Sequence, residues 1–175
     1  MAAVEFRQAT QADAAALIQA LRALAEGLGD AFTADEAGLK KAMGRGICHA
    51  VIAEARGMTM GVALFSPVYS TIYGGAGVFV TDLWVADAVR GQGLGEMLLA
   101  DVWARQVKAW GACYMKLSVG VDNAEARRLY QRLGFEPAEA ETTMLLTRAP
   151  GRAGQGRGKG KADARNKSGG KAKKR

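Results

Sequence analysis

The chain has 175 residues, of which 49% are hydrophobic, and its formal net charge at pH 7 is +7. This length suits one domain with its own core, and the hydrophobic content excludes a chain that is disordered throughout. The sequence has no apolar run of transmembrane length and no basic start followed by an apolar stretch, so it predicts a cytoplasmic protein.

The charge is distributed unevenly along the chain. Residues 151–175 hold ten Lys and Arg and one acidic residue, Asp163, which gives them a net charge of +9 and leaves −2 on the rest of the chain. From Pro150 onward the sequence has neither helix nor strand periodicity and no aromatic residue. We therefore expect one domain over residues 1–149 and a disordered basic tail over residues 150–175.

The first half of the domain shows one strand pattern and two helix patterns. Alternating apolar and polar residues predict a strand over residues 4–9, and leucines at helical spacing predict a helix over residues 11–28. Thr10 with Asp13 has the spacing of a short capping box. Thr33 with Glu36 repeats that spacing before a shorter helix that ends near Met43.

Strand patterns follow, and then two more helices. Three strands are expected at residues 48–54, 59–69 and 78–85, the first two joined by a hairpin turn and the last two by a link that contains glycines. The later elements are a helix at 94–110, a strand at 115–119, a helix capped by Asp122 that ends near residue 133, and a closing strand at 142–147. This order predicts an α/β fold of the α+β type, in which helices flank a mixed sheet.

A glycine-rich loop lies between the strand at 78–85 and the helix at 94–110. Its sequence, AVRGQGLGEMLL, places glycine at positions 91, 93 and 95 after Arg90. Backbone N–H groups free of side chains at a helix N-terminus bind phosphate, and an arginine adds a cation. The spacing fits neither the Walker loop nor the dinucleotide fingerprint, which would need glycine at Glu96.

The loop resembles the Arg-x-x-Gly-x-Gly pyrophosphate signature of the GNAT acetyltransferase superfamily. The segment DNAEARRLYQRLGF resembles the helix of that family which follows it, with Asn123, Tyr130, Gly134 and Phe135 at the defining places. The N-terminal segment FRQATQADAAALIQAL also resembles the family's first strand and helix. The resemblance spans about residues 4–147 and implies a central twisted mixed sheet, acetyl-CoA as the acyl donor, no metal, and a dimer.

Within that family, GVALFSPVYSTIYGGAGVFVTDLWV resembles the branch that acetylates diamines and polyamines. The branch carries a glutamate that binds the amine, and this chain has Thr81 in its place. A second acidic position of the branch, between the first two helices, is also missing. The resemblance therefore implies an N-acetyltransferase for a primary amine of a small molecule, with the acceptor itself left open.

The resemblance also implies roles for single residues. The cofactor-binding residues are the backbone of Leu83, Trp84 and Val85 for the pantetheine arm, the loop of Arg90, Gly91, Gln92, Gly93, Leu94, Gly95 and Glu96 for the pyrophosphate, and Asn123, which has a helix-start role as its alternative. Tyr130 is the candidate catalytic acid, because a phenol is protonated at neutral pH and can donate to the departing thiolate. Asp82 is the best-placed carboxylate to attract the acceptor ammonium and to relay its proton.

Other residues receive weaker assignments. Glu54, Tyr69 and Asp30 are further candidates for lining the amine pocket, and His49 is expected to be structural. The two cysteines, Cys48 and Cys113, have neither metal-ligand nor disulfide spacing and are expected as free thiols.

Two alternatives to a small-molecule acetyltransferase stay open. One is an acetyltransferase that acts on a protein lysine or N-terminus. The other is a degenerate acetyltransferase fold that contacts nucleic acid through its basic tail, since clustered Lys and Arg bind nucleic acid without sequence choice.

Overall fold

The computed structural model describes residues 3–138, and the closing strand expected at 142–147 and the basic tail lie outside them. Five strands form one sheet in the order β1 (Glu5–Gln8), β2 (His49–Ala55), β3 (Met58–Ser70), β4 (Gly75–Val85) and β5 (Tyr114–Leu117). The first four strands are antiparallel neighbours, and β5 runs parallel to β4. The mixed sheet is the one expected from the sequence.

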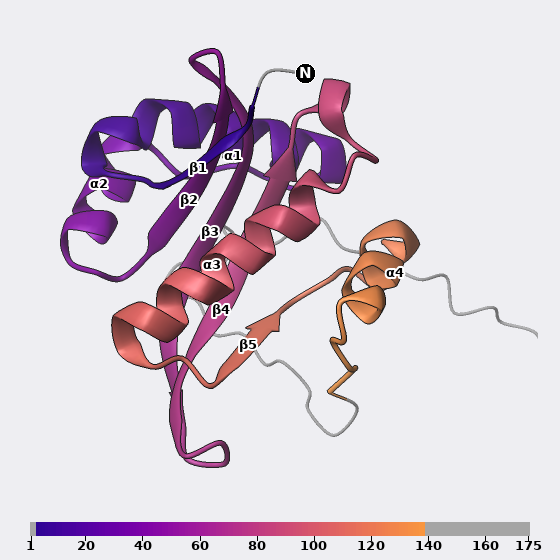
Figure 1. Ribbon diagram of the computed structural model, residues 1–175. Helices are drawn as coiled ribbons and strands as arrows, with labels where there is room; N and C mark the ends of the chain where they lie inside the picture. The colour runs from indigo at the N-terminus through magenta and orange to yellow at the C-terminus, as the bar shows by residue number, and fades with distance from the viewer. Residues whose placement is uncertain (1–2, 139–175) are drawn as a thin grey trace, which may run out of the picture.

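Helices cover both faces of this sheet, as Figure 1 shows. Helices α1 (Ala14–Leu28) and α2 (Glu36–Gly44) pack on one face, α3 (Leu94–Trp110) packs on the other, and α4 (Ala124–Arg132) follows β5. Short 3₁₀ turns, η1 (Gln11–Asp13) and η2 (Asp87–Val89), precede α1 and the glycine loop.

The strand β2 supplies side chains to both cores, because successive side chains in a strand point to opposite faces. Val51 and Ala53 belong to the core under α3, where they meet Leu98 and Val102. Ile52 packs on the opposite face with Leu17 and Val62, under α1 and α2. The sheet is therefore the middle of three layers.

Two of the expected helix caps are wrong by one or two residues. Helix α2 is capped by Asp35, whose side chain accepts from the Gly38 N–H at 2.6 Å, and not by Thr33. Helix α4 is capped by Asn123 and not by Asp122. The capping box expected at Thr10 and Asp13 is confirmed, since the Asp13 carboxylate accepts hydrogen bonds from the backbone N–H and the hydroxyl of Thr10.

The hairpin between β3 and β4 is longer than expected and projects beyond the rest of the sheet (Figure 1). The residues Gly75 and Gly77 were expected in its link, yet they lie inside β4 and pair with β3. Glycine is required at Gly77, because a Cβ there would lie 2.3 Å from the ring of Tyr114 on β5. At the turn, the side chain of Ile72 is 84% exposed.

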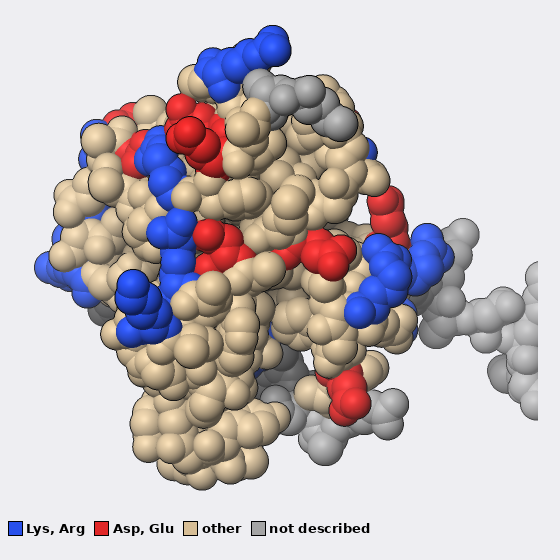
Figure 2. Space-filling model, viewed as in Figure 1, with Lys and Arg blue, Asp and Glu red and all other residues tan. Residues whose placement is uncertain are grey.

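No residue from Met58 through Thr81 carries a charge. In Figure 2 the lower lobe of the molecule, which is the end of this hairpin, correspondingly shows neither blue nor red side chains.

Candidate active site

The strands β4 and β5 separate just before residues 83–85, the segment whose backbone was expected to bind the pantetheine arm. Their pairing runs from Gly77 with Tyr114 to Val80 with Leu117 and stops there. Strand β4 continues to Val85 with β3 on one side, and no strand among residues 3–138 pairs with its other edge beyond Val80. Alternate backbone N–H and C=O groups of residues 81–85 therefore face an opening.

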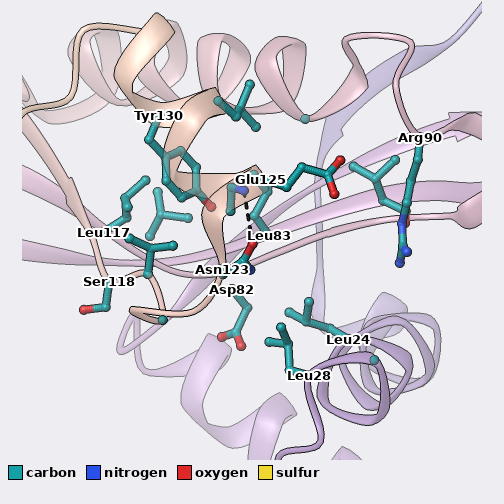
Figure 3. A pocket seen from close by; sticks show the side chains of 18 of the residues that line it. Leu24, Leu28, Asp82, Leu83, Arg90, Leu117, Ser118, Asn123, Glu125 and Tyr130 are labelled. Carbon is teal, nitrogen blue, oxygen red and sulfur yellow. Dashed lines mark hydrogen bonds between the residues drawn. The ribbon is translucent and has the colours of Figure 1, made fainter.

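A cleft of about 1330 Å³ begins at this opening. It lies between β4, the glycine loop, the N-terminal end of α4 and the last turns of α1 (Figure 3). Among the residues proposed from sequence, those that line it are Asp82, Leu83, Val85, Arg90, Gly91, Gly93, Leu94, Gly95, Glu96, Asn123 and Tyr130. The fold thus brings together residues that are up to 48 positions apart, Asp82 and Tyr130.

The glycine loop forms one wall of the cleft with an unusual backbone. Gly91 and Gly93 have φ angles of 73° and 79°, in the left-handed region that glycine adopts without strain. A Cβ built on either residue meets no atom within 4 Å, so both backbones are open to a ligand. Gly93 is also the N-cap of α3, and the first N–H groups of a helix have no partner within it. The loop therefore offers the amide donors that a diphosphate requires.

Arg90 holds the loop against the end of β4. Its Nε donates to the Val85 carbonyl at 3.1 Å, and its Nη2 lies 2.7 Å from the carboxylate of Asp87. The guanidinium is exposed on the rim of the cleft. Its first role in this structure is to position the loop.

Two of the proposed cofactor residues do not line the cleft with their side chains. The side chain of Trp84 packs against the core beneath α1 and α2, and only its backbone was expected to bind the cofactor. The side chain of Gln92 donates to the Ala88 carbonyl at 3.3 Å.

Asn123 starts α4 at the edge of the cleft. Its Oδ1 accepts from the Ala126 N–H at 3.1 Å, shown as the dashed line in Figure 3. The helix-start role is therefore observed, and the amide nitrogen of the same side chain stays available as a donor.

Tyr130 lies on α4 with its ring packed against the core and against Phe135, at a centroid distance of 5.8 Å. Figure 3 shows its hydroxyl turned into the cleft. Burial raises the pKa of this phenol above its ordinary value, so the hydroxyl stays protonated at neutral pH.

Asp82 lies on β4 at the end of the cleft nearest α1. Its carboxylate and the side chains of Leu24 and Leu28 gather there in Figure 3, apart from Arg90. Burial raises the pKa of Asp82, and a hydrogen bond with Thr81 opposes this rise in part. A carboxylate with a raised pKa holds a proton more strongly and is a better base than an exposed one.

The weaker candidates fall in different places. Asp30 lines the same cleft. Glu54 pairs with Arg7 at 3.0 Å on the far edge of the sheet, and Tyr69 is exposed on the projecting hairpin. His49 packs between the rings of Phe65 and Trp110, so its role is structural.

Sequence reasoning missed much of the lining of the cleft, and four of the missed residues bear on its chemistry. Leu24 and Leu28 read only as core positions of a helix, yet the side chain of Leu28 is 45% exposed. Arg128 and Arg132 add two cations from α4. Their spacing of four residues places them on one helical face, a signal that was available in the sequence.

No group of three or more His, Cys, Asp or Glu within residues 3–138 is arranged to hold a metal ion. Over the same residues, none of the helices combines the length and the apolar character that crossing a membrane would need.

The family follows from a comparison of the sequence. Residues 15–135 match the model of the acetyltransferase (GNAT) family. The chain belongs to the GNAT family. It is therefore an acyltransferase, and the family uses acetyl-CoA as its acyl donor. No curated protein sequence matches the chain.

Solved GNAT structures share the fold at low sequence identity. The ribosomal-protein-alanine N-acetyltransferase from Brucella melitensis biovar Abortus 2308 has a TM-score of 0.67 at 18% identity, over 82% of this chain and 100% of that one. An aminoglycoside N-acetyltransferase in complex with CoA has a TM-score of 0.67 at 21% identity, over 85% and 97%. A possible acetyltransferase from Clostridium difficile 630 reaches a TM-score of 0.72 at 16% identity, over 82% and 97%.

Proposed function

We propose that this GNAT protein transfers the acetyl group of acetyl-CoA directly to a primary amine of a small molecule, in the cleft between β4 and α4. One observation carries the proposal. The open edge of β4, the amides of the glycine loop and the hydroxyl of Tyr130 converge on one cleft that also contains a partly buried carboxylate, Asp82.

The donor fits the wall formed by β4 and the loop. Backbone groups at Leu83 and Val85 would pair with the amides of the pantetheine arm, and the N–H groups at residues 91–96 would hold the diphosphate. The side chains of Arg128 and Arg132 add positive charge on the opposite wall. An N–H of the open β4 edge would also stabilise the oxyanion as the thioester carbonyl becomes tetrahedral.

Asp82 and Tyr130 divide the proton transfers. The amine must lose a proton before its nitrogen forms a bond to the carbonyl carbon, and Asp82 attracts the ammonium and relays that proton through water. As the carbon–sulfur bond breaks, Tyr130 donates its proton to the thiolate, and the nitrogen loses its second proton to form the amide. One of the two protons lost by the nitrogen restores the Tyr130 hydroxyl, and the other leaves to solvent. The products are an N-acetylated amine, CoA with a free thiol, and one proton released to solvent.

The acceptor we favour is a diamine or a related small amine. The resemblance to the diamine and polyamine branch supports this choice, and so do carboxylates that line the cleft, Asp82 and Asp30 among them. Thr81 replaces the glutamate of that branch, and its hydroxyl donates to the Leu64 carbonyl at 3.2 Å. The carboxylates of the cleft would then have to hold the amine in place of that glutamate.

The proposal is tested by release of free thiol from acetyl-CoA with a panel of acceptors. The panel contains diamines, polyamines, amino acids, aminoglycosides and peptides, so that it also covers the acceptor types named for the similar folds. Turnover with at least one amine, together with calorimetric binding of acetyl-CoA, supports the proposal. A folded protein that binds no acetyl-CoA contradicts it.

A further inference from the structure

The cleft is shaped for an ammonium group at the end of an aliphatic stem. The Asp82 carboxylate and the side chains of Leu24 and Leu28 line the same cleft and point toward one part of it in Figure 3, so that a cation and a hydrocarbon chain would both find complementary surface. A lysine side chain has this composition, four methylene groups ending in an ammonium, and buries its stem on apolar surface when the head reaches a polar group. The same surface would accept a free alkylamine.

The chain carries its own supply of such side chains. Six of its ten lysines fall in the basic tail: Lys159, Lys161, Lys167, Lys171, Lys173 and Lys174. Lys159 lies between Gly158 and Gly160, and Lys161 follows Gly160. Glycine neighbours have no side chains to collide with the walls of a cleft. Three of the tail lysines follow a glycine, Lys159, Lys161 and Lys171, and the first two of them lie nearest to the described residues in the sequence.

The basic tail is covalently attached within reach of the cleft. Between Ala138, where the described residues end, and Lys159 the chain can span at most about 70 Å. A folded domain of this size has a radius of gyration of only about 14 Å. Covalent attachment turns the encounter between these lysines and the cleft into a step within one molecule, so it does not depend on protein concentration.

The other four lysines lack this access. Lys40 and Lys41 lie on α2, Lys108 lies on α3 and Lys116 lies on β5, so their backbones are fixed in regular structure. Lys40 is also paired with Glu36 at 2.6 Å. None of the four lines the cleft.

We infer that the protein acetylates the lysines of its own basic tail, first Lys159 and Lys161, in the cleft that contains Asp82 and Tyr130. This inference rests on the proposed function. The reaction is the one above, with the lysine Nζ as the nucleophile and acetyl-CoA as the donor. Each transfer removes one positive charge, so acetylation of all six lysines would lower the charge of residues 151–175 from +9 to +3. The tail would then bind acidic partners more weakly when the concentration of acetyl-CoA is high.

The test follows acetylation of the purified full chain with acetyl-CoA by intact mass and peptide mapping. We expect acetyl groups on Lys159 and Lys161 before any appear on Lys40, Lys41, Lys108 or Lys116. The first-order rate constant should stay constant when the protein is diluted tenfold, because donor site and acceptor share one chain. Excess free CoA should slow the reaction.

Two variants sharpen the result. Tyr130→Phe should lower the rate of tail acetylation at least tenfold while calorimetry still detects acetyl-CoA binding, which separates catalysis from spontaneous acetylation of exposed amines. Lys159→Arg with Lys161→Arg keeps the charge and removes the preferred acceptors, so the early acetyl groups should disappear. When unlabelled wild type is mixed with isotope-labelled Tyr130→Phe chains, only the unlabelled chains should be acetylated.

The outcomes separate this inference from the proposed function. If the panel of free amines is acetylated but the tail is not, the inference is overturned and the proposed function stands. Three other outcomes would also overturn the inference. The tail could be acetylated equally fast in Tyr130→Phe, the lysines outside the tail could be acetylated as fast as those in it, or the isotope-labelled Tyr130→Phe chain could become acetylated in the mixture. If neither free amines nor the tail are acetylated, both fall.

Discussion

At the scale of single residues, the cleft depends on two titratable side chains whose pKa values burial raises, Asp82 and Tyr130. Their assigned roles require opposite protonation states, since a base must start without its proton and an acid must start with it. At neutral pH the phenol is protonated, because a Tyr starts near 10 and burial raises its pKa further, whereas Asp82 acts in its carboxylate form. The two groups are therefore suited to work together.

Replacement of the Tyr130 phenol tests its proposed role as the general acid. Tyr130→Phe keeps the ring that packs against Phe135 and removes the proton, so we expect kcat to fall by about 10²- to 10³-fold with little change in melting temperature. Stopped-flow or steady-state thiol release measures the loss, and acetyl-CoA binding serves as the control. Full turnover in this variant would remove Tyr130 from the mechanism.

The pH profile tests the carboxylate. Because the pKa of Asp82 is raised, kcat/KM should increase with pH through a midpoint above the ordinary value of an Asp. In Asp82→Asn that acidic limb should disappear, and the plateau should fall by about 10-fold or more. A profile with the same acidic limb in both proteins would show that another group titrates.

At the scale of elements, the glycine loop and the start of α3 decide whether the donor is held. Gly93 has a positive φ, whereas Gly95 lies in the first turn of the helix with no such constraint. A Cβ on Gly95 would lie 3.7 Å from the nearest side chains, at Leu83, Val85 and Leu129, which is an ordinary contact.

This contrast provides a matched pair of variants. Gly93→Ala should lower the free energy of unfolding by about 1 to 2 kcal/mol, because alanine is strained in the left-handed region. Gly95→Ala should leave stability unchanged or slightly raised, and should weaken acetyl-CoA binding through the methyl group it adds to the cleft wall. Chemical denaturation and calorimetry measure the two effects. Equal stabilities for both variants would contradict the role assigned to Gly93.

The sequence predicted the elements whose signals are local. Periodicity located the strands and helices, and the glycines with Arg90 located the loop. The sequence-based prediction failed at features that depend on residues distant in the chain or on the local path of the backbone. Asp122 and Asn123 are adjacent acceptors of similar capping strength, and only the path of the backbone selects Asn123. The place of Gly77 inside β4 depends on the ring of Tyr114, which is 37 residues away.

The site was predicted in the same uneven way. Asp82 and Tyr130 were identified through the family resemblance, and the structure places both on one cleft. Leu24 and Leu28 escaped notice, because a leucine at helical spacing is the usual sign of a core position. Their approach to Asp82 follows from how α1 crosses the sheet, and periodicity carries no information about that crossing.

At the scale of the whole molecule, the charge is divided between a slightly acidic body and a strongly basic tail. Deletion of residues 151–175 changes the net charge from +7 to −2, so we expect weak, salt-dependent binding to short nucleic acids to disappear. The kcat/KM for a small amine should not fall, because no residue of the cleft is removed. Fluorescence anisotropy at several salt concentrations and thiol release measure the two properties. Loss of amine turnover on deletion would show that the tail takes part in catalysis.

The projecting hairpin of β3 and β4 bears on how the protein behaves in solution. A long ribbon without Lys, Arg, Asp or Glu lacks the charges that keep strands of neighbouring molecules from adhering to one another. We expect self-association that grows with protein concentration, and Ile72→Lys, at an 84% exposed position, should suppress it in sedimentation velocity while leaving thiol release intact. Such adhesion would be a hazard of crowding and storage, unrelated to the chemistry at the other end of the same two strands.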